Sequence, residues 1–219
     1  MRYSFRISLS SSPLTPHEQE EPHSSREGEE DDVEELQIPH VTHGRDVAGY
    51  LRTHLFDKIL RENPETSNQK SLQATNDEIL EDVARSRGGS TAVTAILIDR
   101  QKRIVANVGD SRAILCRGGA LKQLTTDHEP QKEKELVESR DGFVSEMPGI
   151  VPRVDGQLAV TRAFGDGKLK EHITSEPDVR VEMIDPNADE FFIVASDGLG
   201  RVNGLSLVSR SIRNRSEEL

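Results

Sequence analysis

The sequence predicts an α+β domain whose sheet is mostly antiparallel. Two segments with apolar residues at helical spacing come first, and a series of short strand-like segments separated by turns follows. Helices before and after a largely antiparallel sheet are typical of this layered architecture. We expect the domain to cover residues 40–199, because the segments on either side differ from it in composition.

The first 39 residues are expected to be a disordered acidic tail. They contain prolines, a run of serines and a dense acidic stretch over residues 27–35. Like charges at this density repel each other and do not bury a core. The whole chain is only 33% hydrophobic and 31% charged, which also indicates that part of it lies outside a packed core.

Two amphipathic helices are predicted next, over residues 45–61 and residues 71–84. In both, apolar side chains recur at steps of three and four residues and so share one face. The first stripe is Val47, Tyr50, Leu51, Leu55 and Ile59, and the second is Leu72, Ile79, Leu80 and Val83. The acids of the second helix lie mostly on its solvated side.

From residue 90 the pattern changes to that of β-strands. Residues 90–99 are rich in Thr, Val and Ile, and three further short segments at 103–108, 113–116 and 120–124 are bounded by turn residues. We expect a meander in which each strand pairs with the next. A helix over residues 130–139 should follow, with Asp127 as its cap.

The second half of the domain should hold a long packed loop and two more strands. Residues 141–166 combine many glycines and prolines with scattered apolar residues, as a functional loop does more often than a linker. Strands are predicted at residues 179–184 and 190–195. Residues 200–219 follow no clear period and are taken as a divergent C-terminal tail.

Charge and cysteine content argue against several classes of function. The formal net charge of −11 disfavours nucleic-acid binding, which needs a basic surface, and attraction to anionic membranes. No segment is long enough to span a membrane, and we identify no signal peptide. The single cysteine, Cys116, lies in an apolar run and excludes an internal disulfide. We expect a monomer located in the cytoplasm and/or the nucleus.

Two predicted strands end in an aspartate. The apolar run at residues 191–195 leads through Ser196 to Asp197, and the run at residues 104–108 leads through Gly109 to Asp110. A single aspartate beside a glycine is more often a turn residue. Two carboxylates at two strand ends, however, are hard oxygen donors of the kind that bind Mg²⁺ or Mn²⁺. Asp110 and Asp197 are therefore the candidate metal ligands.

Six short motifs connect this pattern to a known family. They are Gly89-Ser90-Thr91-Ala92, Val105-Ala106-Asn107-Val108-Gly109-Asp110-Ser111-Arg112-Ala113, Asp127-His128-Glu129-Pro130, Gly156-Gln157-Leu158-Ala159-Val160-Thr161-Arg162-Ala163-Phe164-Gly165-Asp166, Ser175-Glu176-Pro177-Asp178-Val179 and Ala195-Ser196-Asp197-Gly198. In their order and spacing, residues 44–198 resemble the type 2C, metal-dependent (PPM-type) protein phosphatases, most closely plant-like members. One motif alone would be weak, whereas six together are specific.

The resemblance implies a β-sandwich flanked by helices and a phosphatase chemistry. Family members hydrolyse phosphoserine and phosphothreonine with a water that bridges two Mg²⁺ or Mn²⁺ ions, so phosphoproteins or kinases are the implied partners. Asp197 matches a metal ligand in the family's Ser-Asp-Gly motif, and Asp110 matches an acid of a weaker third metal site. Residues 141–170 match the flap beside the active site, and Asp166 is expected to be structural.

The chain also departs from the family pattern. The family has an Asp-Gly-His motif directly before the first helix, where this chain has His40-Val41-Thr42-His43. Only residues 26–31 match the family's phosphate-binding arginine and early Glu-Asp pair in spelling, and they lie too close to the helix. The family's later Asp-Asn motif does not occur in these 219 residues. We therefore expect a family domain that is incomplete at both ends.

Two functional interpretations remain open at this point. The first is a protein serine/threonine phosphatase with impaired or no activity, since most metal ligands are not matched. The second is a phosphatase-like binding module without catalysis, or a truncated splice or gene-model product. A serine hydrolase built on Ser111 and His128 is disfavoured, because the Gly-x-Ser-x-Gly pattern is missing.

Overall fold

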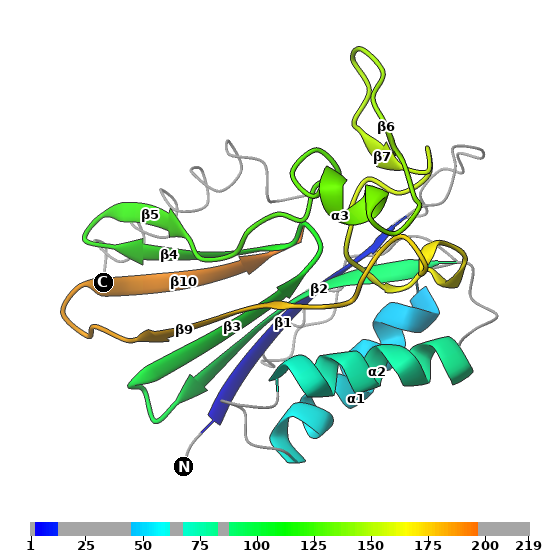
Figure 1. The fold of residues 1–219 in the computed structure, drawn as a ribbon. Coiled ribbons are helices and arrows are strands. Elements are labelled where there is room, and N and C mark those ends of the chain that lie inside the picture. Colours follow the sequence, from blue (N-terminus) through cyan, green and yellow to red (C-terminus); the bar gives the residue numbers. More distant parts are fainter. Residues whose placement is uncertain (1–2, 13–44, 62–67, 83–87, 197–219) are drawn as a thin grey trace, which may run out of the picture.

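The computed structural model describes residues 3–12, 45–61, 68–82 and 88–196. Two antiparallel sheets pack face to face, and two long helices cover the outer side of the larger sheet (Figure 1). This arrangement confirms the predicted α+β class with mostly antiparallel strands. None of the described helices is long and apolar enough to cross a membrane.

The larger sheet has the strand order β1-β2-β3-β9, and the short strand β8 pairs with the start of β2. Every pairing in this sheet is antiparallel. Its strands are β1 (Tyr3–Ser12), β2 (Gly89–Ile98), β3 (Lys102–Val108), β8 (Phe164–Gly165) and β9 (Asp178–Met183). β2 is buried along almost its whole length, because the helices lie on one of its faces and the second sheet on the other.

The smaller sheet has the order β10-β4-β5 and corrects the expected meander. Its strands are β4 (Arg112–Arg117), β5 (Ala120–Gln123) and β10 (Asp189–Ala195). β3 and β4 are consecutive in the chain but lie in different sheets, so the prediction that they pair is wrong. The intervening Gly109-Asp110-Ser111 carries the chain from one layer to the other, and strand periodicity alone does not distinguish such a crossover from a hairpin.

Helices α1 (Arg45–Arg61) and α2 (Asn68–Asp82) pack their apolar stripes onto the larger sheet. Both helices were predicted, although α2 begins earlier than expected; the predicted end at residues 83–84 lies outside the described residues. Buried residues in this layer are Val47, Leu51, Leu55, Ile59, Leu72, Ile79, Ile96, Ile104 and Phe164. The predicted inward residue Leu80 is half-buried, and Val83 lies outside the described residues.

The two sheets are joined by an apolar layer and by one buried ionic group. Val93, Ala95, Val105 and Leu115 lie in the apolar layer. Asp189 of β10 accepts hydrogen bonds from Arg117 of β4 (2.5 Å) and Arg103 of β3 (2.8 Å). 

These bonds from Arg117 and Arg103 lower the pKa of Asp189 although its burial opposes them. The carboxylate is therefore ionised at neutral pH and links both sheets. The predicted buried position of Cys116 in β4 is also confirmed, since its side chain is not exposed.

The N-terminal segment corrects another prediction. Disorder was expected over residues 1–39, but Tyr3–Ser12 form β1 and pair with β2 in an unbroken register from Tyr3–Ile98 to Ser12–Gly89. In sequence, Tyr3, Phe5, Ile7 and Leu9 alternate with polar residues, which is the period of a half-buried strand. Residues 13–39 and the tail at 200–219 lie outside the described residues.

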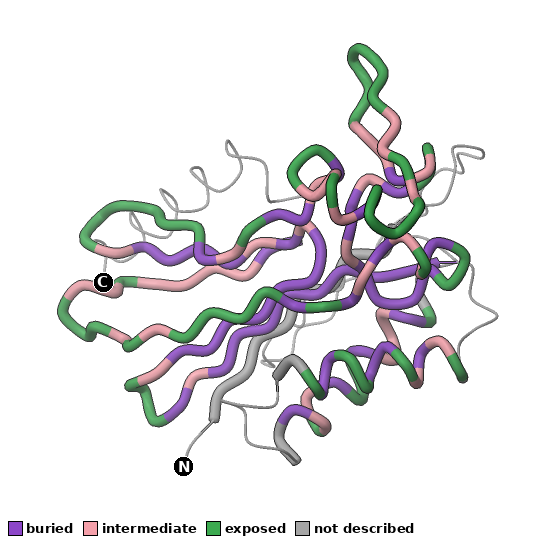
Figure 2. Tube along the Cα trace, viewed as in Figure 1, coloured by how far each residue is buried: buried purple, intermediate pink, exposed green. Residues whose placement is uncertain are grey.

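The predicted loop region forms a small packed unit of its own. It contains α3 (Lys134–Glu138), the hairpin β6 (Val144–Ser145) and β7 (Arg153–Val154), and the short 3₁₀ helix η1 (Gly167–Leu169). Its buried side chains are Val137, Val154, Leu158, Val160, Ala163, Leu169 and Ile173. The tip of the β6–β7 hairpin is exposed and stands away from the sheets (Figure 2).

One helix in this unit is shorter than expected. The prediction placed it at residues 130–139 with Asp127 as its cap, but only Lys134–Glu138 are α-helical and Glu133 occupies the N-cap. Asp127 fails as a cap because its carboxylate is bound by Arg112 and Gln123. A side chain that can reach an arginine gains more from that pairing than from one backbone N–H.

Candidate functional site

The crossover between β3 and β4 holds the predicted ligand Asp110 at the end of a strand. Gly109, just before it, has a φ of +103°, and a Cβ at this position would lie 2.2 Å from Thr91 Cγ2. Only glycine avoids this overlap and the backbone strain. The Ser111 and Thr91 hydroxyls lie 3.0 Å apart and join the crossover to β2. Asp110 is thereby held in a defined, partly exposed position.

His128 holds the same crossover through two hydrogen bonds to Gly109. The Gly109 N–H donates to His128 Nδ1 (2.9 Å), and the His128 N–H donates to the Gly109 carbonyl (3.1 Å). Burial and the nearby Arg162 charge lower the pKa of His128, so the ring is neutral at pH 7 and carries its proton on Nε2. Nε2 lies 3.2 Å from Asp178 Oδ2 but outside hydrogen-bond geometry.

This geometry disfavours the serine-hydrolase alternative. Ser111 pairs with Thr91, while the Nδ1 atom of His128 accepts from a backbone N–H. A nucleophilic serine needs a hydrogen bond to a histidine nitrogen that can take its proton. His128 instead positions the Gly109 peptide, which the sequence did not predict, although Asp127-His128-Glu129-Pro130 was noted as a motif.

Three carboxylates around the crossover are paired with arginines. Asp127 accepts two hydrogen bonds from Arg112 Nε, at 3.0 and 2.9 Å, and these raise the pKa of the Arg112 guanidinium. Arg162 binds Glu133 in the same way, at 3.1 Å from Nε to each carboxylate oxygen. A further Arg162 nitrogen lies 3.3 Å from Asp178 Oδ1. 

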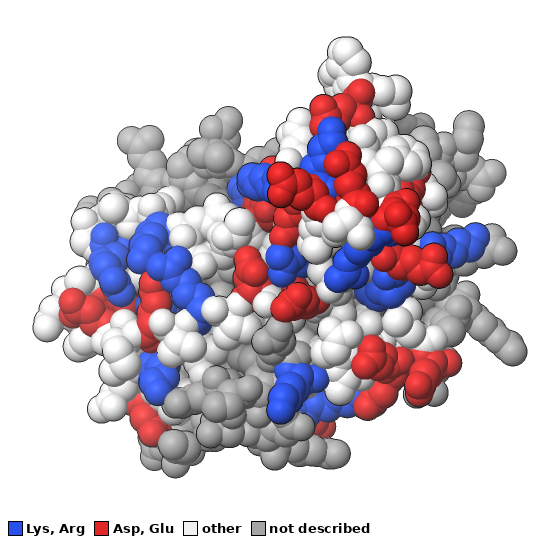
Figure 3. All heavy atoms as spheres, in the orientation of Figure 1, with Lys and Arg blue, Asp and Glu red and all other residues white. Residues whose placement is uncertain are grey.

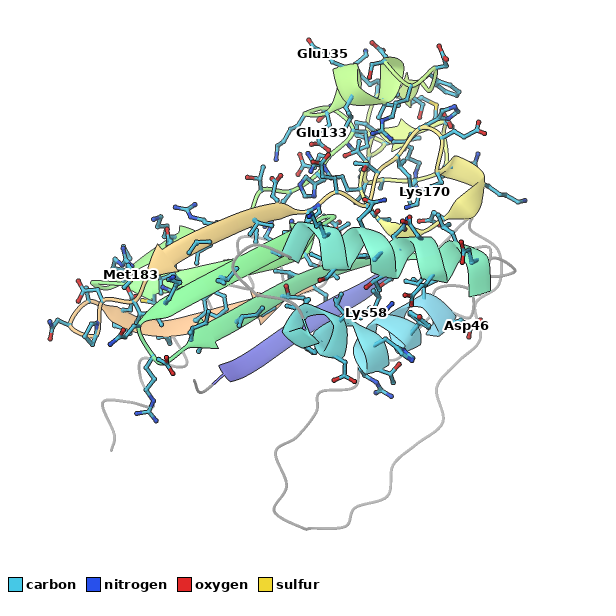
Figure 4. The ribbon with its side chains drawn as sticks, turned by 60° about the horizontal axis from the view of Figure 1, so that its bottom comes forward. Asp46, Lys58, Glu133, Glu135, Lys170 and Met183 are labelled. Atoms are coloured by element: carbon cyan, nitrogen blue, oxygen red, sulfur yellow. The ribbon has the colours of Figure 1, made fainter. Side chains whose placement is uncertain are left out.

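The hydrogen bonds from Arg162 and Thr161 determine the protonation state of Glu133. Burial raises the pKa of Glu133, but the hydrogen bonds from Arg162 and Thr161 outweigh it, and the net pKa is lowered. Figure 4 labels Glu133 between α3 and the sheets, and its carboxylate accepts hydrogen bonds from Thr161 and Arg162. Glu133 is therefore ionised at neutral pH, and its charge is neutralised by Arg162.

The described residues do not by themselves make a metal centre. Within residues 3–12, 45–61, 68–82 and 88–196, no three His, Cys, Asp or Glu side chains are grouped so that they could hold an ion. Asp197 lies outside the described residues. The end of β10 at Ala195 pairs with Arg112, the first residue of β4, which lies two residues after Asp110. The remaining ligands of a two-ion site are not among the described residues.

Asp166 is a separate buried acid at the N-cap of η1. Its side chain is 2% exposed, and neither carboxylate oxygen has a hydrogen-bond partner among the described residues. Burial raises the pKa of Asp166 to about 6, although the charge of Lys170 opposes this. Lys170 in turn donates to the Ala163 carbonyl (2.7 Å), and burial lowers the pKa of Lys170 to about 8.

The surface seen in Figure 3 mixes acidic and basic side chains over the sheets and over the packed unit that contains α3 and the β6–β7 hairpin. Such a mixed surface does not single out one ligand. The β3–β4 crossover remains the candidate site, because it carries a sequence motif with the predicted ligand Asp110 and because β10 ends opposite the start of β4.

Comparison with known proteins gives consistent results. A family model described as "Protein phosphatase 2C" matches residues 6–212. Probable protein phosphatase 2C 28 of Arabidopsis thaliana is 54% identical over 178 residues, which cover 78% of this chain and 52% of that protein. Probable protein phosphatase 2C 62 of Oryza sativa subsp. japonica is 55% identical over 168 residues, which cover 73% and 58%. The chain thus spans little more than half the length of these relatives.

The fold is also found among solved structures. A crystal structure of a phosphatase from a pathogenic strain of Toxoplasma gondii matches with a TM-score of 0.67 and 22% identity, covering 80% of this chain and 73% of that one. At this level of identity the likeness shows the fold alone.

Proposed function

The chain belongs to the protein phosphatase 2C family, and from this premise we propose that it recognises proteins carrying phosphoserine or phosphothreonine but hydrolyses them poorly or not at all. Its expected partners are such phosphoproteins, or the kinases that make them. We also propose a cytoplasmic and/or nuclear location, which the single buried cysteine supports.

The observation that carries this proposal is the ligand set. Family phosphatases depend on metal ions, and a two-ion centre needs several carboxylates to clamp a phosphoryl group. In the position where the family has Asp-Gly-His, this chain has His40-Val41-Thr42-His43, and neither Asp-Gly-His nor Asp-Asn occurs anywhere in its 219 residues. Asp127 and Glu133, two carboxylates around the same crossover, are already bound to arginines.

Mg²⁺ or Mn²⁺ is the cofactor that we propose for the two remaining ligands, Asp110 and Asp197. Magnesium retains most of its water and binds weakly to one or two carboxylates, so we expect low occupancy at cellular concentrations. The described residues do not complete a two-ion site, and no catalytic step is assigned to them.

An active phosphatase is the second candidate, because Asp110 and Asp197 both lie in family motifs and the plant relatives are more than half identical over the matched residues. The two candidates separate in one assay. The purified chain is incubated with a phosphothreonine peptide, with Mn²⁺ or with a chelator, and released phosphate is measured. We expect no metal-dependent release above that of Asp197→Ala.

Binding is measured in parallel by fluorescence anisotropy, using the same peptide with and without its phosphate. We expect saturable binding that requires the phosphate. Metal-dependent turnover that is abolished in Asp197→Ala and retained in Glu171→Ala, a change at an exposed acid two residues after η1, would show that the chain is an active enzyme and that our proposal is wrong.

A further inference from the structure

Strand β9 forms one edge of the larger sheet. On one side it pairs with β3, and no strand in the described part of the chain pairs with its other side. The Ile184 N–H donates to the Gln101 carbonyl (2.7 Å), so the backbone of Ile184 faces the β3 hairpin. Because backbone direction alternates along an antiparallel strand, Val179, Val181 and Met183 direct their N–H and C=O groups toward the open edge.

The same three residues expose apolar side chains. Val179 is 41% exposed, Val181 is 51% exposed and Met183 is 63% exposed. Val181 pairs with Ile104 of β3 and Val179 pairs with Ala106, so these side chains lie on the same face of the sheet. On β3 this face is buried under the helices. The helices do not extend over β9, which is largely exposed in Figure 2 (Met183 is labelled at its end in Figure 4). An unpaired edge with an apolar stripe is a template for another strand.

The sequence of β9 is complementary to itself when two copies run antiparallel. A two-fold axis through Val181 places Val181 opposite Val181 of the second copy and Val179 opposite Met183 of the second copy. On the other face of the sheet, Arg180 then lies opposite Glu182 of the second copy. Apolar pairs and opposite charges in directly facing positions both stabilise antiparallel strands.

Other registers are less favourable. An axis through Arg180 would place two arginines opposite each other, and an axis through Glu182 would place two carboxylates opposite each other. An axis through Val179 would bring Pro177, which has no N–H to donate, into the ladder. Glu182 also has an acceptor oxygen, Oε2, that has no hydrogen-bond partner among the described residues of one copy.

We infer that β9 pairs with β9 of a second copy of this chain, so that the larger sheet continues across two molecules. This inference replaces the monomer expected from the sequence. β9 has only six residues, so the strand contact falls below the roughly 1,200 Å² of total buried surface typical of stable complexes. The dimer should therefore be weak and depend on protein concentration.

Sedimentation velocity of the full chain over a range of concentrations tests the pairing. The wild type should pass from monomer to dimer as concentration rises. Arg180→Glu and Glu182→Arg each create like-charge pairs and should weaken dimerisation by about tenfold or more. An equimolar mixture of the two variants restores opposite charges at both positions, so it should form a heterodimer as readily as the wild type.

Lys168→Glu and Glu171→Arg are the controls, because they make the same changes of charge at exposed positions outside β9 and should dimerise normally. Glu182 also binds Lys122 of β5 and Arg180 of its own strand, so both charge variants lose contacts within one copy, and far-UV circular dichroism checks that each is folded. Val181→Lys, at an exposed side chain, provides a further variant that should be folded and monomeric. The inference is overturned if the wild type stays monomeric at every concentration, if Val181→Lys dimerises like the wild type, or if the folded charge variants fail to associate on mixing.

Discussion

Replacing Asp166 by asparagine should stabilise the fold at neutral pH and leave it almost unchanged in acid. The carboxylate is buried and has no hydrogen-bond partner in the part of the chain that the structure describes, and burial raises its pKa from 3.8 to about 6. This is a shift of about 2 units, and each unit corresponds to about 1.4 kcal/mol. The ionised carboxylate therefore costs about 3 kcal/mol of unfolding free energy.

The direction of the pH dependence follows from proton binding in the two states. Since the folded protein binds this proton more tightly than the unfolded chain, the stabilising contribution is complete below pH 3.8 and is lost as the pH rises through about 6. Above that pH the carboxylate is ionised in both states and the loss stays constant. Asparagine has nearly the same shape and no charge, so Asp166→Asn avoids the loss.

The measurement is urea unfolding followed by far-UV circular dichroism, since the chain has no tryptophan. The free energy of unfolding of Asp166→Asn minus that of the wild type should rise from near zero at about pH 4 to about 2–3 kcal/mol at about pH 7. Glu135→Gln, at an exposed position of α3 (Figure 4), should change stability by no more than about 0.5 kcal/mol. A difference that does not vary with pH, or an asparagine variant less stable than the wild type at pH 7, would refute the reasoning.

Further predictions concern the crossover and its ion pairs. Gly109→Ala should destabilise the fold by about 2–5 kcal/mol in urea unfolding, because the new Cβ combines backbone strain with steric overlap. Gly49→Ala in α1 meets no atom within 4 Å and should instead stabilise by up to about 1 kcal/mol; two changes of the same sign would contradict this contrast. Arg112→Leu leaves the buried Asp127 carboxylate without its charged partner and should cost about 3–5 kcal/mol. Lys132→Leu breaks only an exposed pair and should cost less than about 1 kcal/mol, so similar losses in the two variants would count against the assignment.

The parts of the fold that were predictable are those in which one residue pattern allows one local structure. The apolar residues from Val47 to Ile59 share one face only in an α-helix, and α1 covers this segment. The Thr-, Val- and Ile-rich segments became strands, and the packed nature of residues 141–166 was visible from apolar residues among its glycines. The alternation of apolar and polar residues over Tyr3–Ser12 is equally typical of a strand, but the acidic stretch that follows favoured a prediction of disorder for the whole segment.

The candidate site was predicted less completely, because its residues depend on partners distant in sequence. Asp110 was identified from its position at a strand end. The hydrogen bond between the Gly109 N–H and the His128 ring, in contrast, could not be predicted, since β4 and β5 separate the two residues in sequence and the contact exists only in the folded chain. Asp127 was expected to cap a helix because its neighbours in sequence suggest one. Its actual partner, Arg112, lies 15 residues away in sequence, so the ion pair could not be predicted from the local pattern.

Residue spacing and local backbone preferences were enough to predict most of the helices and strands, the α+β class and the family motifs. The folded chain was needed to establish which strands share a sheet, which carboxylates are paired with arginines and which strand edge is open. Those outcomes depend on burial and on long-range pairing, and the free energy of an ionised group such as Asp166 or of an edge strand such as β9 is set by the groups packed around it.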